Sequence, residues 1–273
     1  MKPRTNGGFL TLPPRSGKPR EVGLTHVLDR GMPLIVLRSL LDLAAPAIDI
    51  LKLGWGTAYV TGNLAEKVAA CRAAGVAICP GGTLLEIAAV QRKVAQFARW
   101  ASRMGFDTVE VSDGAVGLDP ALRRRLISDL SRDFRVLAEV GSKDPQAPVI
   151  PSEWVASAAE DLEAGAAYVI AEGRESGTVG LYRPDGSVRE GLVEALLGHI
   201  PGGRIIFEAP QKAQQAWFIR RLGEQVNLGN VLPDDVLGVE TLRRGLRADT
   251  VWLTVRSWTP SLVAEALFQR SGG

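Results

Sequence analysis

Short apolar runs alternate with longer amphipathic stretches along almost the whole chain. Each run is rich in Val, Ile and Leu and ends in glycine or a charged residue, and a stretch rich in Ala, Leu and Arg follows it. A strand buried in a parallel sheet has this continuous apolar character, whereas the longer stretches have the length and composition of helices. The pattern therefore predicts a chain built of repeated strand-helix units.

The predicted elements are regularly spaced, at intervals that suit a strand, a helix and two short loops. The strands are expected at residues 22–28, 48–53, 76–79, 108–112, 135–140, 168–172, 204–208 and 226–228, and the helices include 84–104, 120–132, 152–164, 211–222 and 233–246. Ser152, Pro120 and Pro233 suit first helical turns, and Gly105, Gly165 and Gly223 suit helix ends.

Eight consecutive strand-helix units predict a single α/β domain folded as a (β/α)8 TIM-type barrel, because right-handed crossovers close that number of units most economically. The 273 residues agree with the size of one such barrel. An open, doubly wound sheet is the alternative. Residues 1–20 are expected to form a flexible basic arm, and 21–273 the barrel, with a strand-like piece and a short helix from residue 251 onward.

Composition narrows the functional class. The net charge of +2 from 32 basic and 30 acidic residues gives no broad surface for nucleic acid or an anionic membrane. No apolar stretch is long enough to cross a bilayer, the start of the chain lacks the pattern of a signal peptide, and the two cysteines need no bridge. We therefore expect a cytoplasmic protein that acts on small molecules.

Polar residues follow the predicted strands with unusual regularity, and parallel barrels carry their active sites at the carboxyl ends of the strands. Counting alternate positions as facing one side gives these candidates: Lys52, Glu110, Ser112, Glu139, Lys143, Glu172, Arg174, Glu208, Asn227 and Asn230. Glutamates that end apolar runs need cations or metal ions as partners. A ring of Lys-Glu pairs that only fixes the strand register is the structural alternative.

Several other kinds of site are disfavoured. His26 and His199 lie at no metal-binding spacing, and the chain shows no nucleophile elbow and no phosphate-binding loop signature. His26 is expected in the core or in the wall of a site rather than as a ligand, and Trp55, between two glycines, is expected in the wall of a site. The run of three arginines that begins at Arg123 is expected on a solvated helix face.

Seven segments resemble the signatures of the phosphosulfolactate synthase family, in that family's order. They are Lys52-Leu-Gly-Trp-Gly-Thr57, Pro80-Gly-Gly-Thr83, Glu110-Val-Ser-Asp-Gly114, Glu172-Gly-Arg-Glu-Ser-Gly177, Phe207-Glu-Ala-Pro-Gln-Lys212, Val226-Asn-Leu-Gly-Asn230 and Glu240-Thr-Leu-Arg-Arg-Gly-Leu-Arg247. The chain departs from the family at Glu139-Val-Gly-Ser-Lys143, where only the second of two lysines is kept, and at His26.

The resemblance implies a (β/α)8 lyase that requires Mg2+, adds sulfite to phosphoenolpyruvate and forms (2R)-phospho-3-sulfolactate for coenzyme M or sulfolactate synthesis. It implies Lys143 as the general acid and association into a homo-oligomer. Glu139, Glu172 and Glu208 are the expected metal ligands, with Glu110 in reserve, since Mg2+ prefers oxygen ligands.

Substrate binding is assigned to the remaining candidates. Lys52 and Arg174 are expected to bind phosphate or sulfite, Ser112 to contact substrate, and Asn227 and Asn230 to lie near the phosphate, which barrels often hold after the last two strands.

Three other functions remain open at this point. A related barrel lyase or transferase would add another nucleophile to an enol-phosphate. A non-catalytic, stress-associated relative would act by protein association. A Schiff-base aldolase would use Lys52 as its nucleophile.

Overall fold

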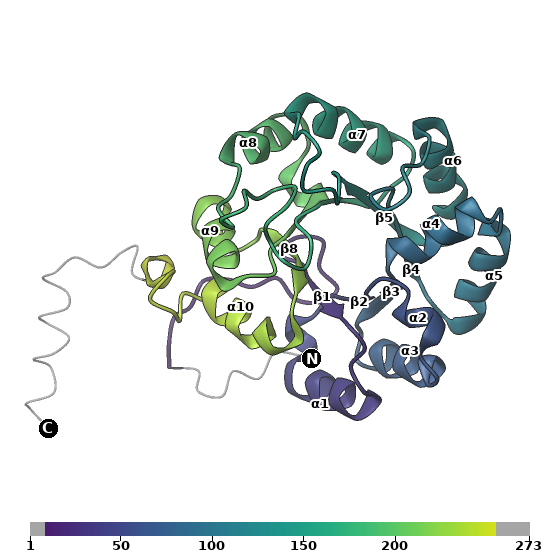
Figure 1. Ribbon diagram of the computed structural model, residues 1–273. Coiled ribbons are helices and arrows are strands. Elements are labelled where there is room, and N and C mark those ends of the chain that lie inside the picture. Colours follow the sequence, from purple (N-terminus) through teal and green to yellow (C-terminus); the bar gives the residue numbers. More distant parts are fainter. Residues whose placement is uncertain (1–8, 255–273) are drawn as a thin grey trace, which may run out of the picture.

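A computed structural model describes residues 9–254 and shows a ring of helices around a central parallel sheet (Figure 1). The strands are β1 (Thr25–Asp29), β2 (Ile50–Leu53), β3 (Ala77–Pro80), β4 (Thr108–Val111), β5 (Arg135–Val140), β6 (Tyr168–Ala171), β7 (Ile205–Glu208) and β8 (Asn227–Val231). The helices are α1 (Leu34–Ala44), α2 (Thr57–Val60), α3 (Leu64–Ala73), α4 (Gly82–Val90), α5 (Val94–Met104), α6 (Pro120–Leu130), α7 (Pro151–Glu163), α8 (Glu190–His199), α9 (Lys212–Leu222) and α10 (Val236–Arg243).

The sheet is a nearly closed barrel. Its strand order is β3-β2-β1-β8-β7-β6-β5-β4, and every pair along this order is parallel. Strands β3 and β4 stand at the two ends of the order. At this seam the Gly82 amide, which follows β3, donates to the Glu110 carboxylate on β4 over 2.8 Å. The (β/α)8 barrel is confirmed, and the open doubly wound sheet is excluded.

The inward-facing side chains form two layers. Leu24, Ile50, Leu137, Ile170 and Ile206 make an apolar cluster in the barrel interior. Two residues further along β2, β5, β6 and β7 stand the buried polar side chains Lys52, Glu139, Glu172 and Glu208. Because side chains two residues apart on a strand face the same side, the apolar layer closes the barrel and the polar layer lies above it, at the carboxyl ends.

Several element boundaries differ from the predictions. The expected helix over 84–104 is two helices, because the chain between α4 and α5 turns at Arg92, whose φ is 56°. The expected helix over 233–246 begins with a 3-10 turn, and the strand-like piece expected at residue 251 is a 3-10 turn over Val251–Leu253. The short helix expected after it lies outside the described residues.

Arg123 contradicts the expectation of a solvated face. Its side chain is buried and donates to both carboxylate oxygens of Asp161 on α7 and to the carbonyl oxygen of Glu139 on β5. A second ion pair, of 3.0 Å, joins it to Asp113. Arg124 and Arg125 do lie on the surface, so Arg123 alone turns inward and ties α6 to the end of β5.

The described part of the basic arm lies against the barrel. Arg15 pairs with Glu240 over 3.0 Å, and Arg20 pairs with Asp49 over 3.3 Å. Lys18 donates to the carbonyl oxygens of Ala45 and Ile48, just before β2. These contacts place residues 15–20 at the amino-terminal ends of the strands. No helix within the described residues is long and apolar enough to cross a membrane.

Candidate active site

A cavity of about 290 Å3 opens at the carboxyl ends of the strands. Among the predicted site residues, Lys52, Glu110, Glu139, Lys143, Glu172, Arg174, Glu208 and Asn230 line it, and so does Trp55. These residues come from strands β2, β4, β5, β6, β7 and β8 or from the loops that follow them. The fold thus brings most of the sequence candidates into one site.

Lys52 stands at the centre of one half of the site. Its ammonium lies 3.1 Å from the carboxylate of Glu110 and 3.2 Å from that of Glu208. Burial by itself would lower the pKa of Lys52, but the glutamates around it, led by Glu110 and Glu208, raise that pKa well above its ordinary value. Lys52 is therefore a fixed positive charge and is unsuited to the neutral amine that a Schiff base requires.

Lys143 occupies the other half. Its ammonium lies 2.6 Å from Glu139, 3.8 Å from Glu172 and 3.9 Å from Glu86. Burial would lower its pKa, but Glu139 and Glu172 raise it above the ordinary value. The aliphatic stem packs against Gly114, where an added Cβ would come within 2.9 Å of it. A charged, positioned ammonium is thus held over the cavity.

The pKa values of Glu139 and Glu172 shift in opposite directions, although burial by itself raises both. For Glu139, burial favours a raised pKa, yet Lys143 and Lys52 lower that pKa to about 2. Burial and the neighbouring Glu139 raise the pKa of Glu172 well above its usual range. The two carboxyl groups therefore titrate as a coupled pair, in which Glu172 keeps its proton to higher pH than Glu139.

Backbone strain concentrates at the cavity. Trp55, Arg174 and Asn230 have φ angles of 54°, 56° and 50°, and all three line the cavity. L-residues seldom adopt this left-handed region, and such conformations persist at functional sites where the surroundings fix them. Arg174 is held by an Nη1–H bond of 3.1 Å to the Lys143 carbonyl oxygen, while the Oδ1 atom of Asn230 is buried without a hydrogen-bond partner.

Two predicted substrate-binding residues lie elsewhere. Asn227 begins β8, and its side chain accepts from the Leu24 amide and donates to the carbonyl oxygens of Gly203 and Ile205, so it ties three segments together at the amino-terminal end. Ser112 is buried, and its hydroxyl donates to the Glu86 carboxylate. Neither side chain lines the cavity.

His26 agrees with its core prediction. The ring is fully buried below the polar layer, and neither ring nitrogen has a hydrogen-bond partner among the described residues. Burial, assisted by Lys52, lowers the pKa of His26 well below its ordinary value. The imidazole is therefore neutral and carries no charge into the site.

Glu86 on α4 is the site residue that sequence reasoning missed. It is fully buried, and besides Ser112 it accepts from the Ala115 and Val116 amides at 2.9 Å each. It thereby anchors the loop after β4 against the stem of Lys143. The available signal was a single acidic residue inside an otherwise apolar helical stretch, Leu84-Leu-Glu-Ile-Ala-Ala-Val90.

Glu86→Ala is expected to lower catalytic turnover about tenfold or more, since it frees the loop that positions Lys143 and leaves buried amides unpaired. Glu86→Gln keeps an acceptor for those amides and should recover most of the loss. The measurement is kcat and KM for both variants beside their melting temperatures. Equal turnover in Glu86→Ala and the unaltered protein would contradict this role.

The donor set suits a hard divalent cation. Buried oxygen atoms of Glu110, Glu139 and Glu172 at the cavity face only the ammonium groups of Lys52 and Lys143, and carboxylate oxygens are the ligands Mg2+ prefers. As the side chains lie, no three His, Cys, Asp or Glu residues in the described part of the chain converge on a common point. Lys52 and Lys143 stand between the glutamates.

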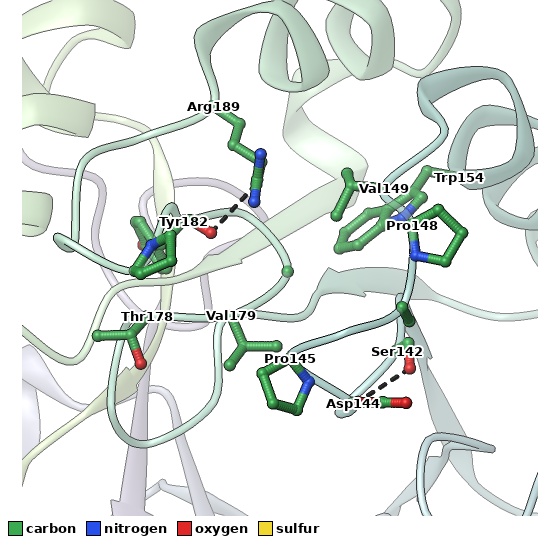
Figure 2. A pocket seen from close by; sticks show the side chains of 13 residues that line it. Ser142, Asp144, Pro145, Pro148, Val149, Trp154, Thr178, Val179, Tyr182 and Arg189 are labelled. Atoms are coloured by element: carbon green, nitrogen blue, oxygen red, sulfur yellow. Dashed lines mark hydrogen bonds between the residues drawn. The ribbon is translucent and has the colours of Figure 1, made fainter.

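A second cavity of about 200 Å3 lies beside the first, between the loop that follows β5 and the loop that follows β6 (Figure 2). Ser142 and Asp144 face it, whereas Lys143 between them lines the first cavity. Trp154 and Val149 form its apolar wall, and Arg189 donates to the Tyr182 carbonyl oxygen at its edge. One loop therefore separates the two cavities.

A parallel barrel with buried, charged side chains clustered at the carboxyl ends of its strands defines a TIM-barrel protein with an enzyme-like site. Comparison of the sequence with known families agrees: residues 13–249 match the family described as (2R)-phospho-3-sulfolactate synthase (ComA). The chain belongs to this family of enzymes.

Individual relatives are similar over nearly their whole length. The chain is 44% identical to the phosphosulfolactate synthase of Methanothermobacter thermautotrophicus, over 89% of this chain and 96% of that protein. It is 40% identical to that of Bacillus subtilis, over 91% of this chain and 100% of that protein.

Solved structures share the fold at low sequence identity. A 3-hexulose-6-phosphate synthase superposes with a TM-score of 0.53 at 15% identity, covering 81% of this chain and 98% of that one. The carboxyl transferase domain of Rhizobium etli pyruvate carboxylase with 3-hydroxypyruvate gives 0.54 at 16% identity, covering 79% of this chain and 41% of that one. These likenesses support the barrel alone.

Proposed function

We propose that this protein adds sulfite to C3 of phosphoenolpyruvate and forms (2R)-phospho-3-sulfolactate, as a Mg2+-dependent lyase. The observation that carries the proposal is the convergence of Lys52, Lys143 and Arg174 with five glutamates in one cavity, in a chain of this family. Sulfite and phosphoenolpyruvate are both anions, so a site that joins them needs several fixed positive charges.

The reaction requires little proton chemistry before bond formation. The sulfur lone pair of sulfite forms the C3–S bond, and the C2–C3 π electrons move toward C2 and the carboxylate. Sulfite is a strong nucleophile without a general base, which agrees with a cavity lined by no histidine among the described residues. A proton then adds to C2 and completes the product, with the phosphate ester retained.

The chain's own cations suit the remaining tasks. Lys143, whose raised pKa keeps it protonated, would donate the proton to C2 and take another from solvent. Lys52 is fixed between Glu110 and Glu208 and would attract the substrate anions. Arg174 and Asn230 would bind the phosphate, to which the guanidinium and the Nδ2 amide group can donate.

Mg2+ would be held by carboxylate oxygens of Glu139, Glu172 and Glu208, with Glu110 as a further ligand. When bound, it would supply positive charge to the carboxylate that develops enolate character. Without it, the carboxylates balance the charge of the two lysines and would repel an anionic substrate.

The test is mass spectrometry of the products formed from phosphoenolpyruvate, sulfite and Mg2+, with and without EDTA. The expected product retains phosphate, contains one sulfite per phosphoenolpyruvate, and is absent with EDTA. Consumption of phosphoenolpyruvate without sulfite, or no adduct from well-folded protein, would overturn the proposal.

Mg2+ at millimolar concentration is expected to raise the melting temperature by several degrees, since a ligand at a hundred times its Kd stabilises the folded state by about 2.7 kcal/mol. Glu139→Gln and Glu172→Gln should abolish that increase. Glu163→Gln, an exposed change on α7, is the matched control and should keep it. Differential scanning calorimetry provides the measurement, and an equal increase in all four proteins would refute these ligands.

A further inference from the structure

The amino-terminal end of the barrel carries a basic pocket, remote from the catalytic cavity. Its volume is about 450 Å3, and it lies among the starts of β2 to β5 and residues 18–20 of the arm. The charged side chains that line it are Lys18, Arg20, Arg72 and Arg135 against Asp49 and Asp107, four cations and two carboxylates. The pocket therefore has an excess of positive charge in a protein whose overall charge is close to neutral.

The arm builds one wall of this pocket in a defined way. Lys18 donates to the Ala45 carbonyl oxygen over 3.0 Å and also to that of Ile48. Arg20 donates to the Pro46 carbonyl oxygen over 2.7 Å and pairs with Asp49. These hydrogen bonds and the ion pair hold the cations of Lys18 and Arg20 in place beside the strands.

The guanidinium of Arg20 is incompletely satisfied. Its side chain is only 4% exposed, and Nε faces the Asp49 carboxylate at 3.3 Å, yet the Nη1 atom is buried without a hydrogen-bond acceptor. Burial is the main cause that lowers the pKa of Arg20, with Asp49 opposing it. Buried charged donors without acceptors are costly, and an oxyanion is the acceptor that a guanidinium fork fits best.

The other two arginines add free donors. Arg135 is the exposed first residue of β5, and neither it nor Arg72 forms an ion pair with a described residue. Arg72 makes one long hydrogen bond of 3.4 Å to the Gly105 carbonyl oxygen. Their guanidinium groups thus remain available to a ligand that enters between the strands and the arm.

We propose that this pocket binds a small multivalent oxyanion of the phosphate or phosphate-ester class. Arg20, Arg72 and Arg135 supply the donors, and Lys18 adds charge from the arm. The volume admits a phosphate ester, and the single small pocket does not offer the extended basic stripe that a nucleic acid needs. The site lies at the end of the barrel opposite to the carboxylate-rich cavity and shares no lining residue with it, so a ligand bound there leaves the catalytic cavity open.

The experiment is calorimetric titration with inorganic phosphate at constant ionic strength, performed on the unaltered protein and on Arg174→Gln, which removes the proposed phosphate donor of the catalytic cavity. The expected result is one phosphate site that persists in Arg174→Gln. Arg135→Gln and Arg72→Gln should each weaken phosphate binding at that site about tenfold, the effect of one lost charge-assisted contact. Arg125→Gln, on the exposed face of α6, is the matched control and should bind phosphate unchanged.

Two outcomes would overturn the proposal. One is phosphate binding that disappears entirely in Arg174→Gln, because the catalytic cavity would then be its only site. The other is equal phosphate affinity in the Arg72→Gln/Arg135→Gln double variant and the unaltered protein. If that double variant instead changes the sedimentation coefficient, the basic surface is a contact between copies of the chain. Failure of the sulfite reaction would leave these binding results unaffected.

Discussion

Lys143→Ala is expected to lower kcat for the sulfite addition by about 10^2- to 10^4-fold, the range that a positioned general acid contributes. The ammonium is held over the cavity by Glu139 at 2.6 Å and Glu172 at 3.8 Å, so its loss would remove both the proposed proton donor and a positive charge from the cavity. Steady-state turnover with saturating phosphoenolpyruvate and sulfite is the measurement.

Lys143→Arg separates these two contributions. The guanidinium keeps the charge but gives up its proton far less readily, so KM should stay near the original value while kcat remains low. Ser142→Ala, next to it on the loop but facing the second cavity, serves as the control and should keep most of the activity. Turnover in Lys143→Ala within a few-fold of the unaltered protein would rule out Lys143 as the acid.

Lys52→Met is expected to reduce the free energy of unfolding by about 3–5 kcal/mol, the cost of removing one partner from a buried charge cluster. Lys52 is 5% exposed and separates the carboxylates of Glu110 and Glu208, so methionine fills a similar volume but leaves two buried carboxylates without their cation. Urea unfolding at neutral pH measures the change.

A double-variant cycle tests the physical reason. Glu208→Gln added to Lys52→Met removes one of the uncompensated charges and should recover part of the lost stability. Lys93→Met, at an exposed position between α4 and α5, is the matched control with an expected change below about 0.5 kcal/mol. If Lys52→Met unfolded at the same urea concentration as Lys93→Met, the cluster would have no structural role.

The two lysines differ in exposure and position although both are surrounded by glutamates. Lys52 is nearly inaccessible and bridges β4 and β7, whereas the Lys143 side chain is 23% exposed on a loop that also borders the second cavity. A proton donor must reach substrate and exchange with solvent, and only Lys143 has that access. This contrast is the structural basis for assigning proton transfer to Lys143 and electrostatic support to Lys52.

Which residues of a single strand share one face of the sheet could be predicted from the sequence alone. Ile50 and Lys52, Leu137 and Glu139, and Ile206 and Glu208 are pairs two residues apart, and each pair has an apolar residue below a charged one. Since the pleat of a strand fixes which side each residue faces, the carboxylate layer follows from the sequence once the strands are located.

Hydrogen bonds between residues far apart in the sequence could not be predicted in this way. Arg123 could not be distinguished in the sequence from its solvated neighbours, but it donates to Asp161, which lies on a different helix. Glu86 lay in an apolar helical stretch, and its partners Ala115 and Val116 follow another strand. No local periodicity encodes such contacts, because they depend on how helices from separate units pack around the barrel.

The sequence by itself determined the barrel, its polar upper layer and the family, because strand pleat, helix periodicity and signature segments are local properties of the chain. The tertiary structure decided which candidates share the cavity. Asn227 and Asn230 lie three residues apart, yet the length and register of β8 send one to each end of the barrel. Where each asparagine lies depends on how the sheet closes into a barrel. Closure involves residues from many strand-helix units, so the residues next to either asparagine in the sequence do not indicate its position.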